Sequence, residues 1–172
     1  LCCDLDPQAC LTNMFGITPA LDPNMLTSHD MIRNEDPVRA RDVIQKTCFP
    51  KLDLIPAGLS LMKFEYEAGF AIRNPSTTGA FHTRIANALE PVLSYYDVVI
   101  LDTPPQINLT VAAALFASRG VLIPMNASMM DVRSLAKFLS IAGKLMEVVE
   151  AYAPDHKFDF MKHLITRYEM MD

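Results

Sequence analysis

Two apolar runs in this chain end in aspartates, and this pattern constrains the fold more than any other feature. The first runs from Leu1 to Asp6 and places Asp4 and Asp6 two residues apart; the second runs from Asp97 to Asp102 and leads into Thr103-Pro104-Pro105. Buried parallel strands are continuously apolar, and the residues that end them lie at the carboxyl edge of the sheet. The sequence therefore predicts that both acidic groups meet at one edge of a parallel sheet.

The rest of the chain alternates between apolar runs and helical patterns. This alternation predicts an α/β fold with a mostly parallel sheet and helices on both faces. The expected strands span residues 1–4, 52–56, 97–102, 120–124 and 158–166. The expected helices span residues 8–15, 37–47, 59–68, 81–93, 109–118 and 131–152, with Asp36 and Asp131 as N-caps. Residues 17–36 and 73–79 have the composition of irregular connections.

Composition narrows the classes of function. With a net charge of −5, the chain lacks the basic surplus of a dedicated nucleic-acid-binding domain, although other parts of a protein or a dimer could still contact DNA. No apolar stretch reaches the roughly 18 residues that span a bilayer, so no membrane partner is expected. The cysteines form no C-x-x-C pair, which favours reduced, buried thiols in a reducing cytoplasm over a zinc site; they are Cys2, Cys3, Cys10 and Cys48.

The acidic motifs suggest a magnesium site. Asp102 closes an apolar strand in the Walker B pattern, in which the carboxylate accepts hydrogen bonds from water bound to Mg²⁺, because Mg²⁺ keeps most of its waters. Asp4 and Asp6 face the same side of an extended chain, so their charges repel unless a cation or hydrogen-bond donors offset them. A plain strand end at Asp102 and a solvated turn after Asp4 are the simpler alternatives.

The sequence contains no glycine-rich loop that could hold phosphates. Its only Gly-Lys pair, Gly143-Lys144, lies in the middle of the last expected helix and not between a strand and a helix. Without a ring of backbone amides and a lysine, these residues should hold ATP poorly. We therefore predict no catalysis from these residues alone.

The last expected helix carries a basic stripe. Arg133, Lys137 and Lys144 are spaced i, i+4 and i+11 on its outer side. A solvated face is the favoured interpretation of such a stripe, and contact with DNA or a partner is the alternative.

Four motifs occur in the same order as in a known family. They are Asp4-Leu5-Asp6-Pro7-Gln8-Ala9, Leu54-Ile55-Pro56, Tyr96-Asp97-Val98-Val99-Ile100-Leu101-Asp102-Thr103-Pro104-Pro105-Gln106 and Leu164-Ile165-Thr166-Arg167-Tyr168-Glu169. Over nearly its whole length the chain resembles the ParA-type partition ATPases of the ParA/MinD superfamily, which carry a deviant Walker A motif. It is most similar to the RepA branch found on RepABC-type plasmids. The resemblance implies a P-loop NTPase-like fold.

The resemblance assigns roles to individual residues. Asp6 matches the catalytic aspartate that orients or activates the attacking water. Asp4 matches the aspartate beside the Mg²⁺ shell and the cofactor, and Asp102 matches the Walker B aspartate that holds Mg²⁺ through water. Thr166 and Arg167 match a cofactor-binding segment near the nucleotide base.

The resemblance also implies an activity, cofactors and partners. Family members use ATP and Mg²⁺, form ATP-dependent homodimers and bind DNA non-specifically when ATP is bound. A ParB- or RepB-type centromere-binding protein stimulates their hydrolysis of ATP, which drives plasmid segregation, and RepA-type members repress their own operon. The implied location is the cytoplasm, in association with the nucleoid or the plasmid.

Residues 1–172 are expected to form part of one ATPase domain that is incomplete at both ends. The deviant phosphate loop, K-G-G-x-x-K-T, should lie just before Leu1, and further strands and helices should follow Asp172. Two alternatives stay open. One is a non-catalytic ParA-like protein that binds DNA or a partner, and the other is a MinD-like site-selection ATPase.

Overall fold

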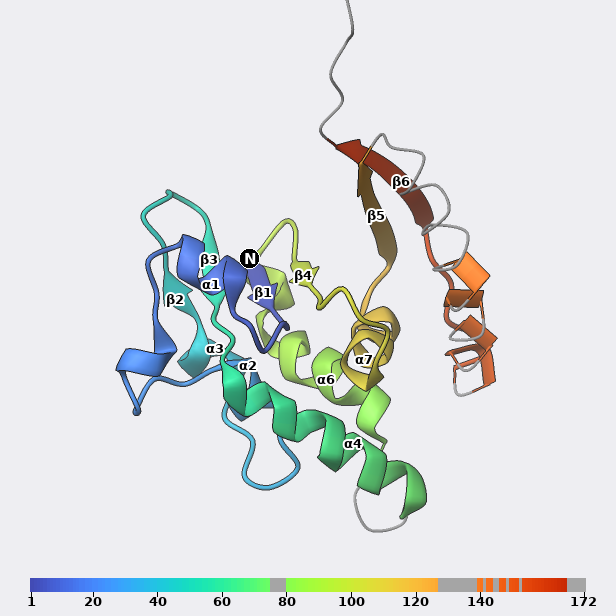
Figure 1. Cartoon of the computed structure of the whole chain (residues 1–172), viewed down its shortest axis with the longest axis horizontal. Coiled ribbons are helices and arrows are strands. Elements are labelled where there is room, and N and C mark those ends of the chain that lie inside the picture. Colours follow the sequence, from blue (N-terminus) through green and yellow to red (C-terminus); the bar gives the residue numbers. More distant parts are fainter. Residues whose placement is uncertain are drawn as a thin grey trace, which may run out of the picture. The chain divides into compact units, whose positions relative to one another are not determined.

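The first acidic run forms a central strand of a four-stranded sheet in a computed structural model of the chain (Figure 1). The structure describes residues 1–74, 80–126, 139–140, 142–143, 146–147, 149–151 and 153–166. Strand β1 (Cys2–Asp4) runs parallel to β3 (Asp53–Ile55) on one side and to β4 (Ile100–Asp102) on the other. Strand β2 (Gln45–Lys46) pairs antiparallel with β3, which gives the order β2-β3-β1-β4.

Helices surround this sheet within a first compact unit, Leu1–Ala117. The α-helices are α1 (Cys10–Met14), α2 (Ser28–Ile32), α3 (Ala40–Val43), α4 (Met62–Arg73), α6 (Arg84–Leu89) and α7 (Leu109–Ala117). The 3₁₀ helices are η1 (Pro19–Leu21), η2 (Leu59–Leu61), η3 (Phe81–Thr83) and η4 (Glu90–Tyr95). Helix α7 contacts both α4 and α6, and α2 contacts the same two helices (Figure 1).

The apolar runs supply the core of this unit. Leu5 after β1, Leu54 and Ile55 of β3, and Phe64 and Ile85 of the helices are fully buried. Burial of such side chains is the main term that stabilises a domain of this size. The predicted α/β fold with a parallel sheet is confirmed.

The second compact unit, Ser118–Asp172, contains its own pair of strands. Strand β5 (Gly120–Asn126) runs parallel to β6 (Phe160–Thr166), as the two last apolar runs predicted. The described residues between 139 and 151 are helical. The expected N-cap of that helix and the basic stripe lie outside the described residues; they are Asp131, Arg133, Lys137 and Lys144.

The structure differs from the helix predicted at residues 37–47. Only α3 is helical there, with Arg39 as its N-cap, and Asp36 has a left-handed φ of +45° instead of the extended backbone of an N-cap. The chain becomes extended at Ile44 and then forms β2. Pairing with the edge of β3 outweighs the local helical pattern, so this prediction was wrong at both ends of the helix.

The connection predicted at residues 17–36 contains a helix that its polar composition concealed. Helix α2 begins after Thr27, whose backbone amide and hydroxyl both donate to Oδ2 of Asp30, at 2.8 and 3.0 Å. A Thr followed three residues later by an acid is the pattern of a capping box, so the signal was present in the sequence. Of the loop expected at 73–79, residues 75–79 lie outside the described residues.

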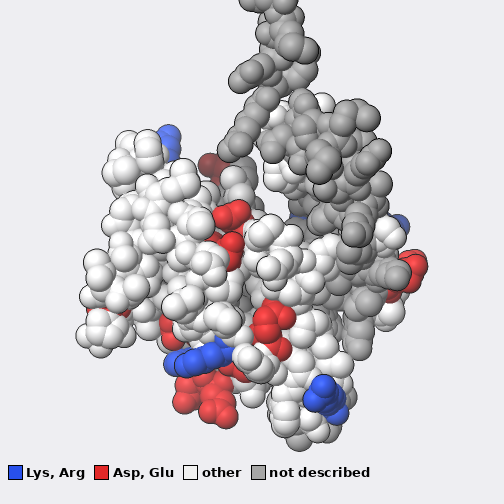
Figure 2. Space-filling model, in the orientation of Figure 1, with Lys and Arg blue, Asp and Glu red and all other residues white. Residues whose placement is uncertain are grey.

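Among the described residues, no broad basic patch is visible on the face shown in Figure 2. Figure 2 shows that the Lys and Arg side chains on that face lie apart from one another. None of the helices in the described residues is long and apolar enough to cross a membrane.

One buried carboxylate ties the antiparallel edge of the sheet to the segment before β4. Asp53 of β3, with a side chain only 9% exposed, accepts hydrogen bonds from Nζ of Lys46 and from the hydroxyl of Tyr96, both at 2.8 Å. Burial acts to raise the pKa of Asp53, but the bonds from Lys46 and Tyr96 outweigh it, so the pKa lies below its usual value. Burial and the bond to Asp53 in turn raise the pKa of Tyr96 to about 12.

We expect Tyr96→Phe to destabilise the intact protein by about 1–3 kcal/mol at pH 7, because it removes a hydrogen bond to a buried charge. Tyr95→Phe, at a neighbouring side chain that is 78% exposed, is the matched control. A carboxyl with a lowered pKa stabilises the fold above its unfolded pKa, and this stabilisation is lost as the pH falls through the folded value. Urea unfolding should therefore show that the loss of stability in Tyr96→Phe is smaller at low pH than at pH 7. Equal unfolding midpoints for Tyr96→Phe and Tyr95→Phe at pH 7 would contradict the stabilising role of the bond between Tyr96 and Asp53.

Candidate functional site

Three aspartates come together at the carboxyl edge of β1 and β4, which we call the acidic edge: Asp4, Asp6 and Asp102. In the sheet register Asp4 lies directly beside Asp102, and the backbone amide of Leu5 donates to the carbonyl of Asp102 at 2.8 Å. Partial burial and the charges of Asp4 and Asp6 raise the pKa of Asp102 above its usual value. The predicted meeting of the two acidic motifs is confirmed.

Asp4 is fully buried and hydrogen-bonded on both oxygens. Its Oδ1 accepts from the amide of Asp6 at 3.0 Å, and its Oδ2 accepts from the amide and the hydroxyl of Thr12 at 2.9 and 2.6 Å. The Thr12 hydroxyl accepts in turn from the amide of Ala57 at 2.9 Å. These donors offset the repulsion between Asp4 and Asp6 that the sequence predicted. In the structure Asp4 holds the turn and α1 in place. Its predicted position beside the Mg²⁺ shell stays a prediction.

Thr12 is the residue of this site that the sequence did not reveal. It lies in α1, eight residues beyond Asp4, and it is fully buried. Neither its spacing from Asp4 nor a motif marks it, since only the turn at residues 6–9 brings it back over the strand. The same is true of Ala57, which reaches the site from the end of β3.

Asp6 starts the turn that leads into α1. Its Oδ1 accepts from the amide of Gln8 at 2.9 Å, and its carbonyl accepts from the amide of Ala9 at 2.8 Å. Ala9 has a left-handed φ of +54°, which costs an L-residue other than glycine about 1–2 kcal/mol. The turn thus holds the Asp6 carboxylate half-exposed at the acidic edge, where it can still accept further hydrogen bonds.

Asp102 is the solvent-accessible member of the acidic edge. Among the described residues, no set of three or more His, Cys, Asp and Glu side chains is arranged to ligate a metal ion directly. Carboxylate oxygens are nevertheless the donors that Mg²⁺ prefers, and Mg²⁺ keeps several waters when it binds. Burial and the charges of Asp4 and Asp6 together raise the pKa of Asp102. A nearby cation would relieve the repulsion between these carboxylates, so the site fits Mg²⁺ held through water.

The segment after Asp102 is fixed at its far end. The carboxylate of Glu65, on α4, accepts from the amides of Leu109 and Thr110 at 3.1 and 2.9 Å and from the hydroxyl of Thr110 at 2.6 Å. These bonds satisfy donors that the first turn of α7 would otherwise leave free. Glu65 therefore links α4 to the segment that follows the second acidic motif.

The last two predicted site residues both belong to the second unit. Thr166 is the final residue of β6, and Arg167 lies outside the described residues. Their assignment to the nucleotide base stays a prediction.

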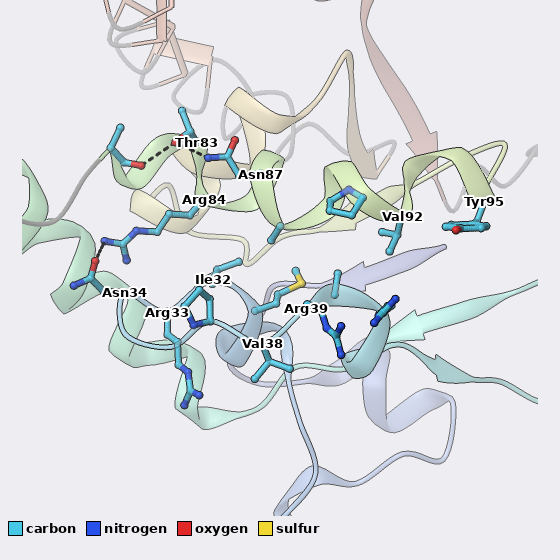
Figure 3. Close-up of a pocket in the computed structure, with 17 residues that line it drawn as sticks. Ile32, Arg33, Asn34, Val38, Arg39, Thr83, Arg84, Asn87, Val92 and Tyr95 are labelled. Carbon is cyan, nitrogen blue, oxygen red and sulfur yellow. Dashed lines mark hydrogen bonds between the residues drawn. The ribbon is translucent and has the colours of Figure 1, made fainter.

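A groove of about 610 Å³ lies apart from the acidic edge, between the α2–α3 segment and the η3–η4 segment (Figure 3). Its described lining contains four arginines and no carboxylate: Arg33, Arg39, Arg41 and Arg84. Each arginine lies within ion-pair distance of an acid that is not part of the lining: Asp30, Asp42 or Glu67. The groove therefore carries little uncompensated charge, and none of the three aspartates lines it.

Comparison with known proteins identifies the family. The sequence profile of a family described as an AAA domain (AAA_31) matches residues 1–152. The chain belongs to this family. It is 38% identical over 175 residues to a protein of Sinorhizobium fredii NGR234 provisionally named replication protein A, a match that covers the whole chain but 43% of the relative. The chain thus spans less than half the length of that relative. The predicted kinship with ParA-type partition proteins is confirmed.

Two solved structures share the fold. A plasmid partition protein from Borrelia burgdorferi matches with a TM-score of 0.71 at 24% identity, over 98% of this chain and 66% of that one. Cobyrinic acid a,c-diamide synthase from Mycobacterium smegmatis, with a bound ATP analogue and magnesium, matches with a TM-score of 0.75 at 25% identity, over 99% and 63%. The P-loop NTPase-like fold class is confirmed.

We expect Thr12→Val to destabilise the intact protein by about 2–4 kcal/mol, because it takes a donor from a buried carboxylate and an acceptor from the Ala57 amide. Thr12→Ser keeps the hydroxyl and should cost only about 1 kcal/mol. Chemical denaturation of both variants measures the difference. Equal losses would show that Thr12 acts through its methyl group and not through the hydrogen bonds.

Asp102→Asn should raise the melting temperature of the metal-free protein at pH 7. Because the folded pKa of Asp102 is raised, ionisation disfavours the folded state, and wild-type stability falls as the pH rises from the ordinary Asp value through the folded value. The two proteins should converge at pH values below that window. Added Mg²⁺ should stabilise the wild type more than Asp102→Asn, and an equal response to Mg²⁺ in thermal scans refutes the role of Asp102.

Proposed function

We propose that the intact protein is a plasmid partition ATPase of the RepA/ParA kind. The observation that carries the proposal is the acidic edge, where Asp102 ends β4 and Asp6 lies two residues beyond the end of the adjacent parallel strand β1, both with their carboxylates accessible. Membership of the AAA domain family supports it, as does the fold shared with a structure that holds an ATP analogue and magnesium. Because the chain covers only part of its relatives, the activity belongs to the intact protein.

The residues of the acidic edge divide the work of hydrolysis. Asp6, held half-exposed by its turn, accepts a hydrogen bond from the attacking water and orients it, as a general-base position requires. Asp4 fixes the turn through the amide of Asp6, and Asp102 accepts hydrogen bonds from water around the cation. When bound, Mg²⁺ would supply the positive charge that the carboxylates of Asp6 and Asp102 favour, and ATP would supply the phosphoryl group.

We also propose how the intact protein works in the cell, from its kinship with partition proteins. ATP and Mg²⁺ drive homodimer formation, and the dimer binds DNA non-specifically in the cytoplasm at the nucleoid or the plasmid. A ParB- or RepB-type partner stimulates hydrolysis and resets the cycle, which segregates the plasmid, and the protein represses its own operon. Thr166 and Arg167 lie near the base in this scheme.

The exposed side of β4 is consistent with a further strand that carries the phosphate loop. Among the described strands β4 pairs only with β1, and its side chain Ile100 is 56% exposed, with the preceding Val98 at 63%. A strand at the edge of a sheet presents backbone N–H and C=O groups that can pair with a further strand. We propose that the segment with the deviant phosphate loop, expected upstream of Leu1, pairs with this edge in the intact protein.

The test is the ATPase activity of the intact protein with Asp6→Ala. We expect ATP binding and dimerisation to persist while hydrolysis slows by at least about tenfold, since a water-positioning group is lost. Asp22→Ala is the matched control, because the exposed Asp22 makes the same local bond, its Oδ1 accepting from the amide of Asn24 at 3.0 Å. Wild-type turnover in Asp6→Ala would refute the role of Asp6. An intact wild type that binds ATP but does not hydrolyse it would favour the non-catalytic alternative.

A further inference from the structure

Helix α4 has two faces of unlike character. The inner face carries Phe64, Ala68 and Ala71, all buried. The other side, with the preceding turn of η2, carries large apolar side chains in solvent: Leu59 at 68% exposed, Met62 at 52%, Tyr66 at 80% and Phe70 at 57%. Spacings of three and four residues place these four on one side of the helix. We call them, together with Lys63 and Arg73, the outer face of α4.

The charges near this face are sorted by sign. The two acids of the helix point inward, Glu65 to the first turn of α7 and Glu67 to Arg84 and the amide of Asn34, at 3.1 and 2.8 Å. Lys63 and Arg73 are exposed, and neither makes an ion pair in the part of the chain that the structure describes. The outer face therefore combines apolar side chains with positive charge and no carboxylate.

A stripe of this kind is costly to leave in water. A fully covered aromatic side chain removes about 150–250 Å² from solvent, and apolar burial contributes about 25 cal/mol per Å². Single exposed apolar residues are ordinary, but a contiguous set on one helix face marks an interaction surface. The outer face of α4 also differs in charge from the groove in Figure 3, because the arginines of the groove already lie beside acids.

We propose that the outer face of α4 binds an amphipathic helix of an acidic partner protein. The partner presents apolar residues at three- and four-residue spacing to Met62, Tyr66 and Phe70, and acids that pair with Lys63 and Arg73. Those two cations are ten positions apart, which is about 15 Å along a helix. A second copy of this face is a poor partner, because like charges would then be brought together. This interaction goes beyond the ATPase activity and needs none of the acidic edge.

The test uses a fluorescent synthetic helix of about five turns, with leucines at the apolar spacing and glutamates elsewhere, titrated into the intact protein. A twin with lysines in place of the glutamates is the second probe. We expect the acidic probe to bind at least about tenfold more tightly than the basic one, with an affinity that falls as salt is added. Equal binding of the two probes overturns the charge argument and the proposal.

Variants locate the binding on the helix. The pair Tyr66→Ser and Phe70→Ser should weaken binding of the acidic probe at least about tenfold, and the pair Lys63→Glu and Arg73→Glu should reverse the preference between the probes. Leu21→Ser is the matched control, because Leu21 is 83% exposed but lies in η1, and it should change affinity less than about twofold. Thermal scans check that every variant is folded. Unchanged binding in the serine pair overturns the proposal.

Measurements on variants of the same protein test three other molecules or segments that could cover the outer face of α4. Slow maleimide labelling of Tyr66→Cys in the intact protein, with the exposed Cys10 and Cys48 changed to Ser, would mean that another of its own segments covers the face. Loss of self-association in the serine pair, followed by sedimentation, would identify a second copy. Loss of binding to phosphatidylserine vesicles or to duplex DNA in that pair would identify an anionic surface. Each of these results overturns the proposal, whereas rapid labelling together with selective binding of the acidic probe supports it.

Discussion

The hydrogen bonds around the carboxylate of Asp4 hold the site together. This buried carboxylate accepts hydrogen bonds from the amide of Asp6 and from the amide and hydroxyl of Thr12. The Thr12 hydroxyl in turn accepts a hydrogen bond from the amide of Ala57. The end of β1, the start of α1 and the exit from β3 are therefore fixed to one another. An ion buried without such donors would cost several kcal/mol, so the geometry of the acidic edge depends on this set of bonds.

The three aspartates of the acidic edge differ in burial and in hydrogen bonding. Asp4 is buried and hydrogen-bonded, whereas Asp6 and Asp102 keep oxygens that solvent can reach. The same residue type thus supports the fold at one position and, in the proposed mechanism, faces the water or the cation at the two others. What separates them is burial and the supply of donors, not the motif in which each occurs.

The strands and the acidic edge could be predicted from the sequence because each depends on a local pattern. An apolar run that ends in Asp102 predicts both a strand and the place of its last residue, and the register with β1 confirmed it. The hydrogen bonds of the carboxylates could not be predicted from the sequence. Tertiary packing brings Thr12 to Asp4 and Glu65 to Thr110, and no local pattern marks either pair. Helix α3 shows the same limit, because pairing of β2 with β3 overrides a helical pattern.

The left-handed backbone at Ala9 restricts how this turn can vary. The residue is only 6% exposed, so a larger side chain would meet the packed interior, and its φ of +54° penalises any residue with a branched β-carbon. Glycine avoids the backbone penalty, and alanine is the smallest residue that fills the space. If every amino acid is tried at position 9, folded protein should therefore be obtained essentially only with alanine and glycine. The neighbouring, exposed Gln8 should tolerate many replacements.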